Sequence, residues 1–447
     1  MVGLMPKVYV ADVLCGGGKT TAAINYINAS PPDAKFLFVT PYLPECTRVI
    51  GSCPSKYFEQ PTEERFGRQK KLTKLSDMRI LLEGHRNIAS THALFPRYTE
   101  DMLNIIREQH YTLFLDEAYD VAKPFKSEDK AAFYDEVDKG TIVFDETGRA
   151  SWAGQRPHPE STLSELYWQV QNGAVYSYGK HLLIWMFPPE ILMAFDKIII
   201  LTYLFEAQTL RYYLETLGIE YQLVTTKHDA DGYSFCDLYD PDAVQQKKNF
   251  RNLIHILDNP KLNQIGDEEC SLSSNWYKKD MRDNKGRKIA RLAKNVRNVQ
   301  KNIYKCSVND FIWTTYSDFE EDVHDKNIKH RFLTWNKKAV NDYRTCHYLA
   351  FGINIFAQPD AYKYFKHHGV MMDCDLWALS EMIQWIWRSA IRDGEEIWIY
   401  IPSKRMRTLL ENWIDEVSST GLEGGDDVAT VSPYHNPADD AGEKNIA

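Results

Sequence analysis

ADVLCGGGKTT, at residues 11–21, is the stretch that decides how the rest of the chain is interpreted. It follows a short apolar run, 7–10, that has the composition of a buried strand, and it precedes a segment with helical spacing, 22–27. A strand, a glycine loop and a helix in this order form the layout of a phosphate-binding loop. The glycines let the backbone N–H groups point towards an anion, and the N-terminus of the helix adds its positive end.

The end of this loop carries the residues expected to bind a nucleotide. Lys19 would reach the β and γ phosphates, and the Thr20 hydroxyl would bind Mg²⁺. The full pattern G-x-x-x-x-G-K-[ST] has glycine where this chain has Val13, and the remaining core is the form common in helicases. The alternative, a glycine-rich turn that only begins a helix, does not account for Lys followed by Thr. The predicted phosphate-binding residues are therefore Gly16, Gly17, Gly18, Lys19, Thr20 and Thr21.

A second motif, Asp116-Glu117, comes directly after an apolar strand-like run at 111–115. A metal-nucleotide site needs this arrangement, because one carboxylate holds Mg²⁺ and the next orients the attacking water. The alternative is that the two acids only cap a helix. The phosphate loop about a hundred residues upstream favours the catalytic interpretation, with Asp116 at the metal and Glu117 at the water.

Composition limits the class of protein. The 447 residues are enough for two or three domains, and 44% hydrophobic residues can fill their cores. No run of eighteen apolar residues occurs and the N-terminus lacks the layout of a secretory signal, so we expect a cytoplasmic protein without a membrane partner. The eight cysteines include no C-x-x-C pair, so neither a zinc site nor a disulfide framework is indicated.

The net charge of −9 does not favour nucleic-acid binding, so this prediction rests on local basic stretches. Residues 278–305 contain eleven Lys or Arg against two Asp. Within them, a helix at about 286–305 places apolar residues on one face and Lys294 and Arg297 elsewhere. We predict contact with backbone phosphates, and a solvated surface helix is the alternative. A second basic run, 65–74, allows the same two interpretations.

Further elements are expected along the chain. Strand-like runs occur at 35–40, 87–91, 197–203, 331–336 and 397–401. The irregular, polar region at about 122–178 is interpreted as an insertion that contains a hairpin at 141–152. A helix at 378–392 would put Gln384, Arg388 and Arg392 on one face, where the arginines either stabilise a transferring phosphoryl group or form surface ion pairs. Residues 418–447 are expected to form a flexible acidic tail.

With these motifs in place, the chain resembles superfamily 2 helicases, in particular the DEAD/DEAH-like helicases of bacteriophages and prophages. The run DEAY at 116–119 looks like motif II, and 384–392 is similar to motif VI in its phage form. Motif VI usually spaces its arginines three apart after a glycine, so this chain leaves open which arginine contacts the γ-phosphate. The remaining similarities imply nucleic-acid contact by Thr40, Pro41 and Tyr42 (motif Ia) and by Thr91 and His92, and coupling by Thr202 (motif III).

The resemblance implies an α/β fold of two RecA-like lobes, at 1–217 and 218–417, with parallel sheets flanked by helices. It also implies ATP and Mg²⁺ as cofactors, with Arg388 and Arg392 completing the site from the second lobe. The partner would be single-stranded or branched DNA in replication, recombination or repair, alongside proteins of those processes, and RNA remains an alternative. The other candidates are a terminase-like viral packaging ATPase and a nucleotide-binding switch that does not unwind.

Overall fold

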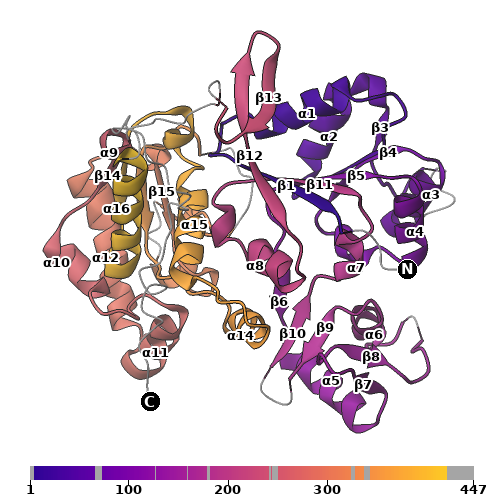
Figure 1. Cartoon of the computed structure of the whole chain (residues 1–447). Coiled ribbons are helices and arrows are strands. Elements are labelled where there is room, and N and C mark those ends of the chain that lie inside the picture. The colour runs from indigo at the N-terminus through magenta and orange to yellow at the C-terminus, as the bar shows by residue number, and fades with distance from the viewer. Residues whose placement is uncertain are drawn as a thin grey trace, which may run out of the picture. The chain divides into compact units, whose positions relative to one another are not determined.

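The computed structural model describes residues 5–65, 73–125, 127–158, 160–178, 182–240, 243, 250–323, 328–336 and 343–419. Its contacts divide the chain into two units. The first unit comprises Met1–Gln246, Thr334–Arg344 and Ile355–Arg388, and the second comprises Lys247–Leu333, Thr345–Asn354 and Ser389–Ala447. Each unit contains a parallel sheet flanked by helices, so the expected α/β class is confirmed (Figure 1). The predicted acidic tail lies outside the described residues from position 420 onwards.

The first unit is built on an eight-stranded sheet in the order β13-β12-β1-β11-β5-β2-β4-β3. Every neighbouring pair is parallel except β12 with β13. The strands are β1 (Lys7–Asp12), β2 (Phe36–Thr40), β3 (Phe58–Glu59), β4 (Asn87–Thr91), β5 (Thr112–Asp116), β11 (Lys197–Thr202), β12 (Tyr221–Asp229) and β13 (Gly232–Asp237). The strands predicted at 7–10, 35–40, 87–91, 111–115 and 197–203 are therefore confirmed.

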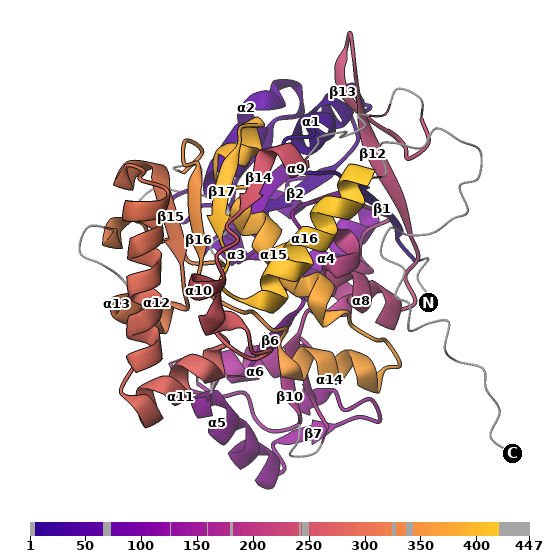
Figure 2. The same ribbon diagram turned by 90° about the vertical axis from the view of Figure 1, so that its left-hand side faces the viewer.

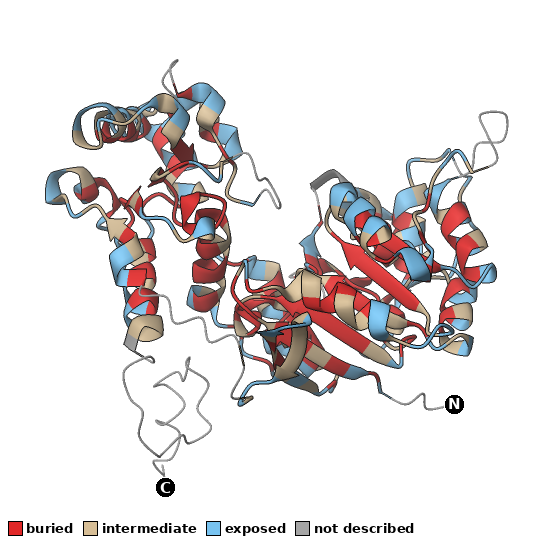
Figure 3. Cartoon of the chain, turned by 90° about the horizontal axis from the view of Figure 1, so that it is seen from above, coloured by how far each residue is buried: buried red, intermediate tan, exposed pale blue. Residues whose placement is uncertain are grey.

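Both faces of this sheet are covered, which is why its central strands are continuous apolar runs. In β2, Phe36 and Phe38 pack into one core, and Leu37 and Val39 pack into the other. Figure 3 shows these strands as buried. The helices of this unit are α1 (Lys19–Ala29), α2 (Leu43–Ser52), α3 (Lys74–Glu83), α4 (Glu100–Glu108), α7 (Pro189–Leu192), α8 (Thr209–Thr216), α14 (Pro359–His367) and α15 (Cys374–Ile386).

The insertion between β5 and β11 has a small core of its own, which includes Phe133, Leu166 and Val175. It contains a three-stranded antiparallel sheet and a separate hairpin, β7 with β8, at the position predicted for one. Its elements are β6 (Ala122–Pro124), α5 (Ser127–Asp138), β7 (Ile142–Phe144), β8 (Ala150–Trp152), α6 (Ser164–Gln171), β9 (Val175–Ser177) and β10 (Leu183–Met186).

The second unit contains a four-stranded parallel sheet in the order β14-β17-β16-β15. Figure 2 shows α12 (Arg287–Asn298) beside β15 (Phe311–Thr314), and Leu292 and Val296 pack with Phe311 and Trp313 in the core of this unit. The strands are β14 (Ile254–Ile256), β15 (Phe311–Thr314), β16 (Tyr348–Phe351) and β17 (Ile397–Tyr400). The helices are α9 (Phe250–Leu253), α10 (Pro260–Asn263), α11 (Ser274–Asn284), α12 (Arg287–Asn298), α13 (Glu320–Val323) and α16 (Lys404–Ser419).

The structure differs from the expected boundary between lobes at residues 217 and 218. Strand β12 pairs with β1, Val8 opposite Tyr221, so the chain beyond 217 completes the first sheet. Residues 355–388 also belong to the first unit, where the Tyr212 hydroxyl accepts a hydrogen bond from the backbone N–H of Asp373 at 3.0 Å. These pairings join positions far apart in the sequence, and local patterns do not reveal them.

Two further predictions about local structure are wrong. The run 331–336 is not a strand: Lys329–Arg331 is a 3₁₀ turn, and only Phe332 forms an isolated bridge. The helix predicted at 378–392 ends at Ile386, and a separate 3₁₀ turn follows at Ala390–Asp393. The backbone N–H of Ala390 bonds to the Cys346 carbonyl at 3.0 Å, which draws the chain into the second unit. Within the described part of the chain, no helix is long and apolar enough to cross a bilayer.

Candidate nucleotide-binding site

The glycine loop lies between the end of β1 and the start of α1. Gly16 and Gly18 have φ angles of 89° and 82°, in the left-handed region that glycine enters without steric cost. The loop is closed by a hydrogen bond from the Gly17 N–H to the Leu14 carbonyl at 3.0 Å. The ammonium group of Lys19 folds back onto the loop, where it donates to the carbonyls of Val13 and Leu14. This is the strand, loop and helix geometry predicted for a phosphate-binding loop.

Asp116 lies at the end of β5, which is next to β11 and therefore one strand away from β1. Its carboxylate lies 3.5 Å from the hydroxyl of Thr20 and accepts a hydrogen bond from Thr40 at 3.1 Å. Burial raises the pKa of Asp116 to about 7, and the neighbouring charge of Glu117 contributes in the same direction. Carboxylate and hydroxyl oxygens are the ligands that Mg²⁺ prefers, so the oxygens of Thr20 and Asp116 fit a magnesium ion.

Glu117 occupies a strained backbone position. Its φ angle of 61° is left-handed, which is uncommon for a residue other than glycine. The strand β11 holds both halves of the site: the Leu201 carbonyl accepts from the Glu117 N–H at 2.9 Å, and the Thr202 carbonyl accepts from the Val13 N–H at 3.0 Å. Strain of this kind is concentrated at functional sites, where the surrounding structure enforces it. The end of β11 therefore fixes the glycine loop relative to the acidic pair.

Arg388 is buried in the same unit as the acidic pair. Its Nη1 atom is buried and has no hydrogen-bond partner among the residues that the structure describes. Burial lowers the pKa of the Arg388 guanidinium, while the nearby charges of Glu117 and Tyr42 oppose that shift. A buried N–H group without an acceptor costs free energy. The structure thus leaves one buried donor of this guanidinium without an acceptor in the described part of the chain.

The residues predicted to contact nucleic acid fall into two groups. In the first unit, the Thr40 side chain is fully buried and bonds to Asp116, so it faces the acid. His92 lies close to the same residue, with Nε2 3.1 Å from the Asp116 carbonyl oxygen. Pro41, Tyr42 and Thr91 are partly exposed next to them. Contact between these residues and nucleic acid stays a prediction.

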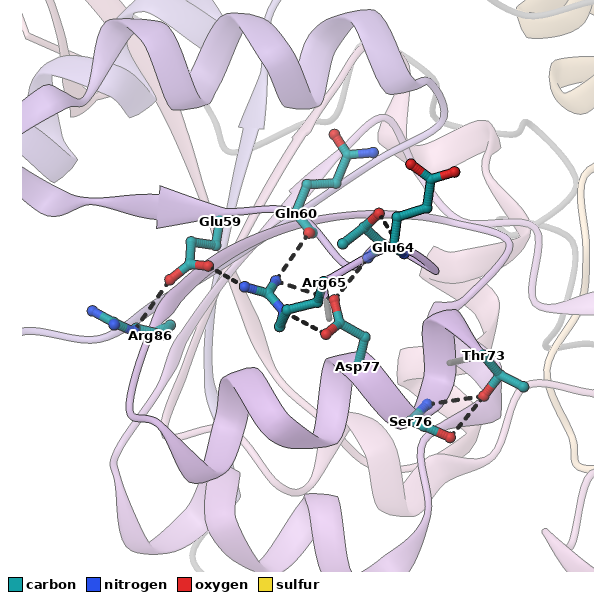
Figure 4. A network of polar contacts seen from close by, with 9 residues as sticks. Glu59, Gln60, Glu64, Arg65, Thr73, Ser76, Asp77 and Arg86 are labelled. Atoms are coloured by element: carbon teal, nitrogen blue, oxygen red, sulfur yellow. Dashed lines mark hydrogen bonds and ion pairs between the residues drawn. The ribbon is translucent and has the colours of Figure 1, made fainter. Parts of the chain in front are cut away.

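The other group of predicted residues lies outside this cluster. Lys294 and Arg297 lie exposed on α12 of the second unit, the helix that begins at Arg287. Arg392 belongs to the second unit as well, so it does not share a helical face with Arg388. Gln384 lies on α15 of the first unit. Arg65, from the basic run at 65–74, is held by the carboxylates of Asp77 and Glu59 (Figure 4).

Sequence reasoning missed the hairpin formed by β12 and β13 as part of this site. The Thr226 hydroxyl on β12 donates to the Gly17 carbonyl at 2.7 Å, and the Tyr233 ring on β13 packs against Gly18. The only local signal was the alternation typical of a hairpin, with Gly232 at the turn, and nothing in that pattern points to a loop some 210 residues upstream.

Comparisons with known proteins show one extensive similarity in sequence. Residues 248–414 match the family profile described as the YonV C-terminal Rossmann-like domain. The chain is 36% identical over 420 residues to the "SPbeta prophage-derived uncharacterized protein YonV" of Bacillus subtilis (strain 168), which covers 92% of this chain and 99% of that protein.

Similar solved structures include Xpd4 of S. tokodaii, with 11% identity, a TM-score of 0.42, and coverage of 91% of this chain and 94% of that one. The DUF1998 helicase MrfA bound to DNA and AMPPNP also matches, with 11% identity, a TM-score of 0.33, and coverage of 92% of this chain and 48% of that one.

Proposed function

The chain belongs to the family of the SPbeta prophage protein YonV, and we propose that it is an ATP-dependent helicase or translocase that acts on nucleic acid. One observation carries the proposal. The first unit brings together a glycine loop ending in Lys19 and Thr20, the acids Asp116 and Glu117, and the buried Arg388. Each of these groups has a distinct part in nucleotide hydrolysis, and a loop that only binds phosphate needs neither Glu117 nor Arg388.

We propose the following roles for these residues. Gly16, Gly18 and Thr21 supply backbone N–H groups to the phosphates, and Gly17 keeps the loop closed through its bond to the Leu14 carbonyl. Lys19 binds the β and γ phosphates. Thr20 and Asp116 hold Mg²⁺, which supplies neutralising charge at the phosphate oxygens when bound. The Glu117 carboxylate orients the attacking water and receives its proton. Arg388 stabilises the charge that develops on the transferring phosphoryl group.

The structure changes one part of the expected mechanism. Arg388 belongs to the first unit, so in this proposal the arginine that acts on the phosphate comes from the same unit as the glycine loop. We keep the proposed catalytic roles of Arg392, which lies in the second unit, and of Gln384 on α15 of the first unit. Thr202 couples hydrolysis to nucleic-acid binding through its backbone bond to Val13 at the glycine loop.

We propose single-stranded or branched DNA as the partner, with RNA as the alternative. In a parallel sheet the carboxyl ends of the strands meet at one edge, so Pro41, Tyr42, Thr91 and His92 lie at the same edge as the nucleotide site. The exposed cations Lys294 and Arg297 on α12 would bind backbone phosphates without reading sequence. Binding that depends on these cations should weaken steeply as salt is added.

The test is ATP hydrolysis by the purified protein alone and with single-stranded DNA, single-stranded RNA, duplex DNA and branched DNA. Lys19→Ala and Glu117→Gln should each abolish turnover, and Glu117→Gln should retain ATP binding because the phosphate loop is intact. Lys363→Ala, which changes an exposed lysine on α14, is the matched control and should behave as wild type. Stimulation by DNA that disappears in Lys19→Ala supports the helicase or translocase assignment.

Other outcomes identify the alternatives. ATP binding without turnover on any nucleic acid would refute the motor and indicate a nucleotide switch. Turnover accompanied by Mg²⁺-dependent cleavage of DNA would indicate a packaging ATPase of the terminase type.

A further inference from the structure

The hairpin of β12 and β13 is fixed against the nucleotide site by specific contacts. Strand β12 pairs with β1, which leads into the glycine loop, and Figure 1 shows the hairpin beside α1. The Thr226 hydroxyl donates to the Gly17 carbonyl at 2.7 Å. Across the hairpin, the Asn25 side-chain amide of α1 donates to the Tyr233 carbonyl at 2.8 Å. These bonds hold β13 against the loop and the first turns of α1.

The ring of Tyr233 approaches the loop so closely that only glycine fits at position 18. A Cβ atom at Gly18 would lie 2.1 Å from Cδ1 of that ring, well inside van der Waals contact. Gly18 also has a left-handed φ of 82°. The last glycine of the loop therefore serves two purposes, because it permits the backbone turn and leaves room for an aromatic ring.

A second ring completes this feature. His228 lies opposite Tyr233 in the antiparallel register of the hairpin, and the two ring centroids are 4.5 Å apart with an angle of 60° between planes. Tyr233 is partly buried between Gly18 and His228, whereas His228 is exposed. The outer ring of the pair is thus open to solvent beside the loop that would hold the phosphates.

We propose that His228 and Tyr233 form the platform on which the base of the bound nucleotide stacks. The proposal rests on the proposed function of the glycine loop as a phosphate site. Stacking on an aromatic ring uses the π face that every base has, so a platform of this kind discriminates weakly between bases. We therefore expect the hairpin to add affinity for a nucleoside triphosphate beyond that for its phosphates alone. We also expect ATP and GTP to compete at similar concentrations.

The test compares a ligand with a base and a ligand without one. Dissociation constants in the presence of Mg²⁺ are measured for ATP, GTP and inorganic tripolyphosphate, using Glu117→Gln as the background so that no ligand is consumed. In this background His228→Ala should weaken the binding of ATP about tenfold, as expected for one stacking contact, and should leave the dissociation constant of tripolyphosphate unchanged. His228→Phe, which keeps an aromatic ring without the imidazole nitrogens, should restore ATP affinity. Tyr239→Ala, which removes an exposed ring just beyond β13, is the matched control and should leave the dissociation constants of all three ligands unchanged.

Each other result overturns a defined part of the argument. If His228→Ala leaves ATP affinity unchanged, or weakens ATP and tripolyphosphate equally, the platform is refuted while the phosphate site stands. If the Glu117→Gln protein binds ATP no more tightly than tripolyphosphate, no base platform exists. If Lys19→Ala does not weaken the binding of ATP or of tripolyphosphate, the proposed function itself fails.

Discussion

Replacing Arg65 by alanine should destabilise the first unit by about 3 kcal/mol, because it leaves the fully buried carboxylate of Asp77 without its cation. Arg65 donates to Asp77 through two nitrogens, one of them at 3.1 Å, and it also pairs with Glu59 (Figure 4). Breaking a buried pair by removing one partner costs about 3–5 kcal/mol. The lower end applies here, because Arg65 is 22% exposed and the Thr62 N–H still donates to Asp77 at 2.7 Å.

Urea unfolding followed by far-ultraviolet circular dichroism measures this loss. The matched control is Arg79→Ala, which removes an exposed arginine paired with Glu83 and Asp101 and should cost much less, because solvent screens exposed ion pairs. The double variant Arg65→Met with Asp77→Leu should recover part of the loss, since an apolar pair replaces the ions but the Thr62 N–H loses its acceptor. If Arg65→Ala costs no more than Arg79→Ala, the buried pair does not contribute as argued.

Two further predictions follow from single contacts. Thr40→Val keeps the side-chain shape but removes the 3.1 Å bond to Asp116, so ATP hydrolysis should need a higher Mg²⁺ concentration. Thr40→Ser keeps the hydroxyl and should behave as wild type. Equal Mg²⁺ dependence of hydrolysis in the two variants and the wild type would contradict this prediction. His347 is partly buried, which lowers its pKa, but Asp310 and Glu395 outweigh burial and raise it. A raised pKa means that the protonated form of His347 stabilises the folded state. This stabilisation is complete below a pH of about 6.5 and disappears as the pH rises through the pKa of the folded state. His347→Gln should thus lower the urea midpoint more at pH 5.5 than at pH 9, and equal losses would refute it.

The geometry of the proposed nucleotide site was predictable from sequence because its parts are local. Lys19 and Thr20 begin α1 after the loop that follows β1, and Asp116 and Glu117 stand at the end of β5. In a parallel sheet, residues that follow strands meet at one edge, so two short motifs were enough to bring these side chains together. The left-handed backbone of Glu117 has no signal in composition or periodicity, because neighbouring strands impose it.

The remainder of the first unit depends on contacts between distant segments. Arg388 was expected in the second lobe because of the resemblance to motif VI, but residues 355–388 return to the first unit. The hairpin that carries Tyr233 was not foreseen, and its residues fell within the range expected for the second lobe because the boundary was set at 217. The run at 331–336 has the apolar content of a strand, yet Arg331 donates to the carbonyls of Asn309 and Phe311, and the backbone turns before a ladder can form.

The discontinuous first unit has a consequence for how the protein is made. The chain passes from one unit to the other five times, and α14 and α15 of the first unit are synthesised only after most of the second. Until they emerge from the ribosome, the apolar surface that receives Phe365 and Met372 stays uncovered. The first unit therefore cannot finish folding during translation of its own N-terminal half, and a gene fragment that stops at codon 246 would direct synthesis of a product prone to aggregate.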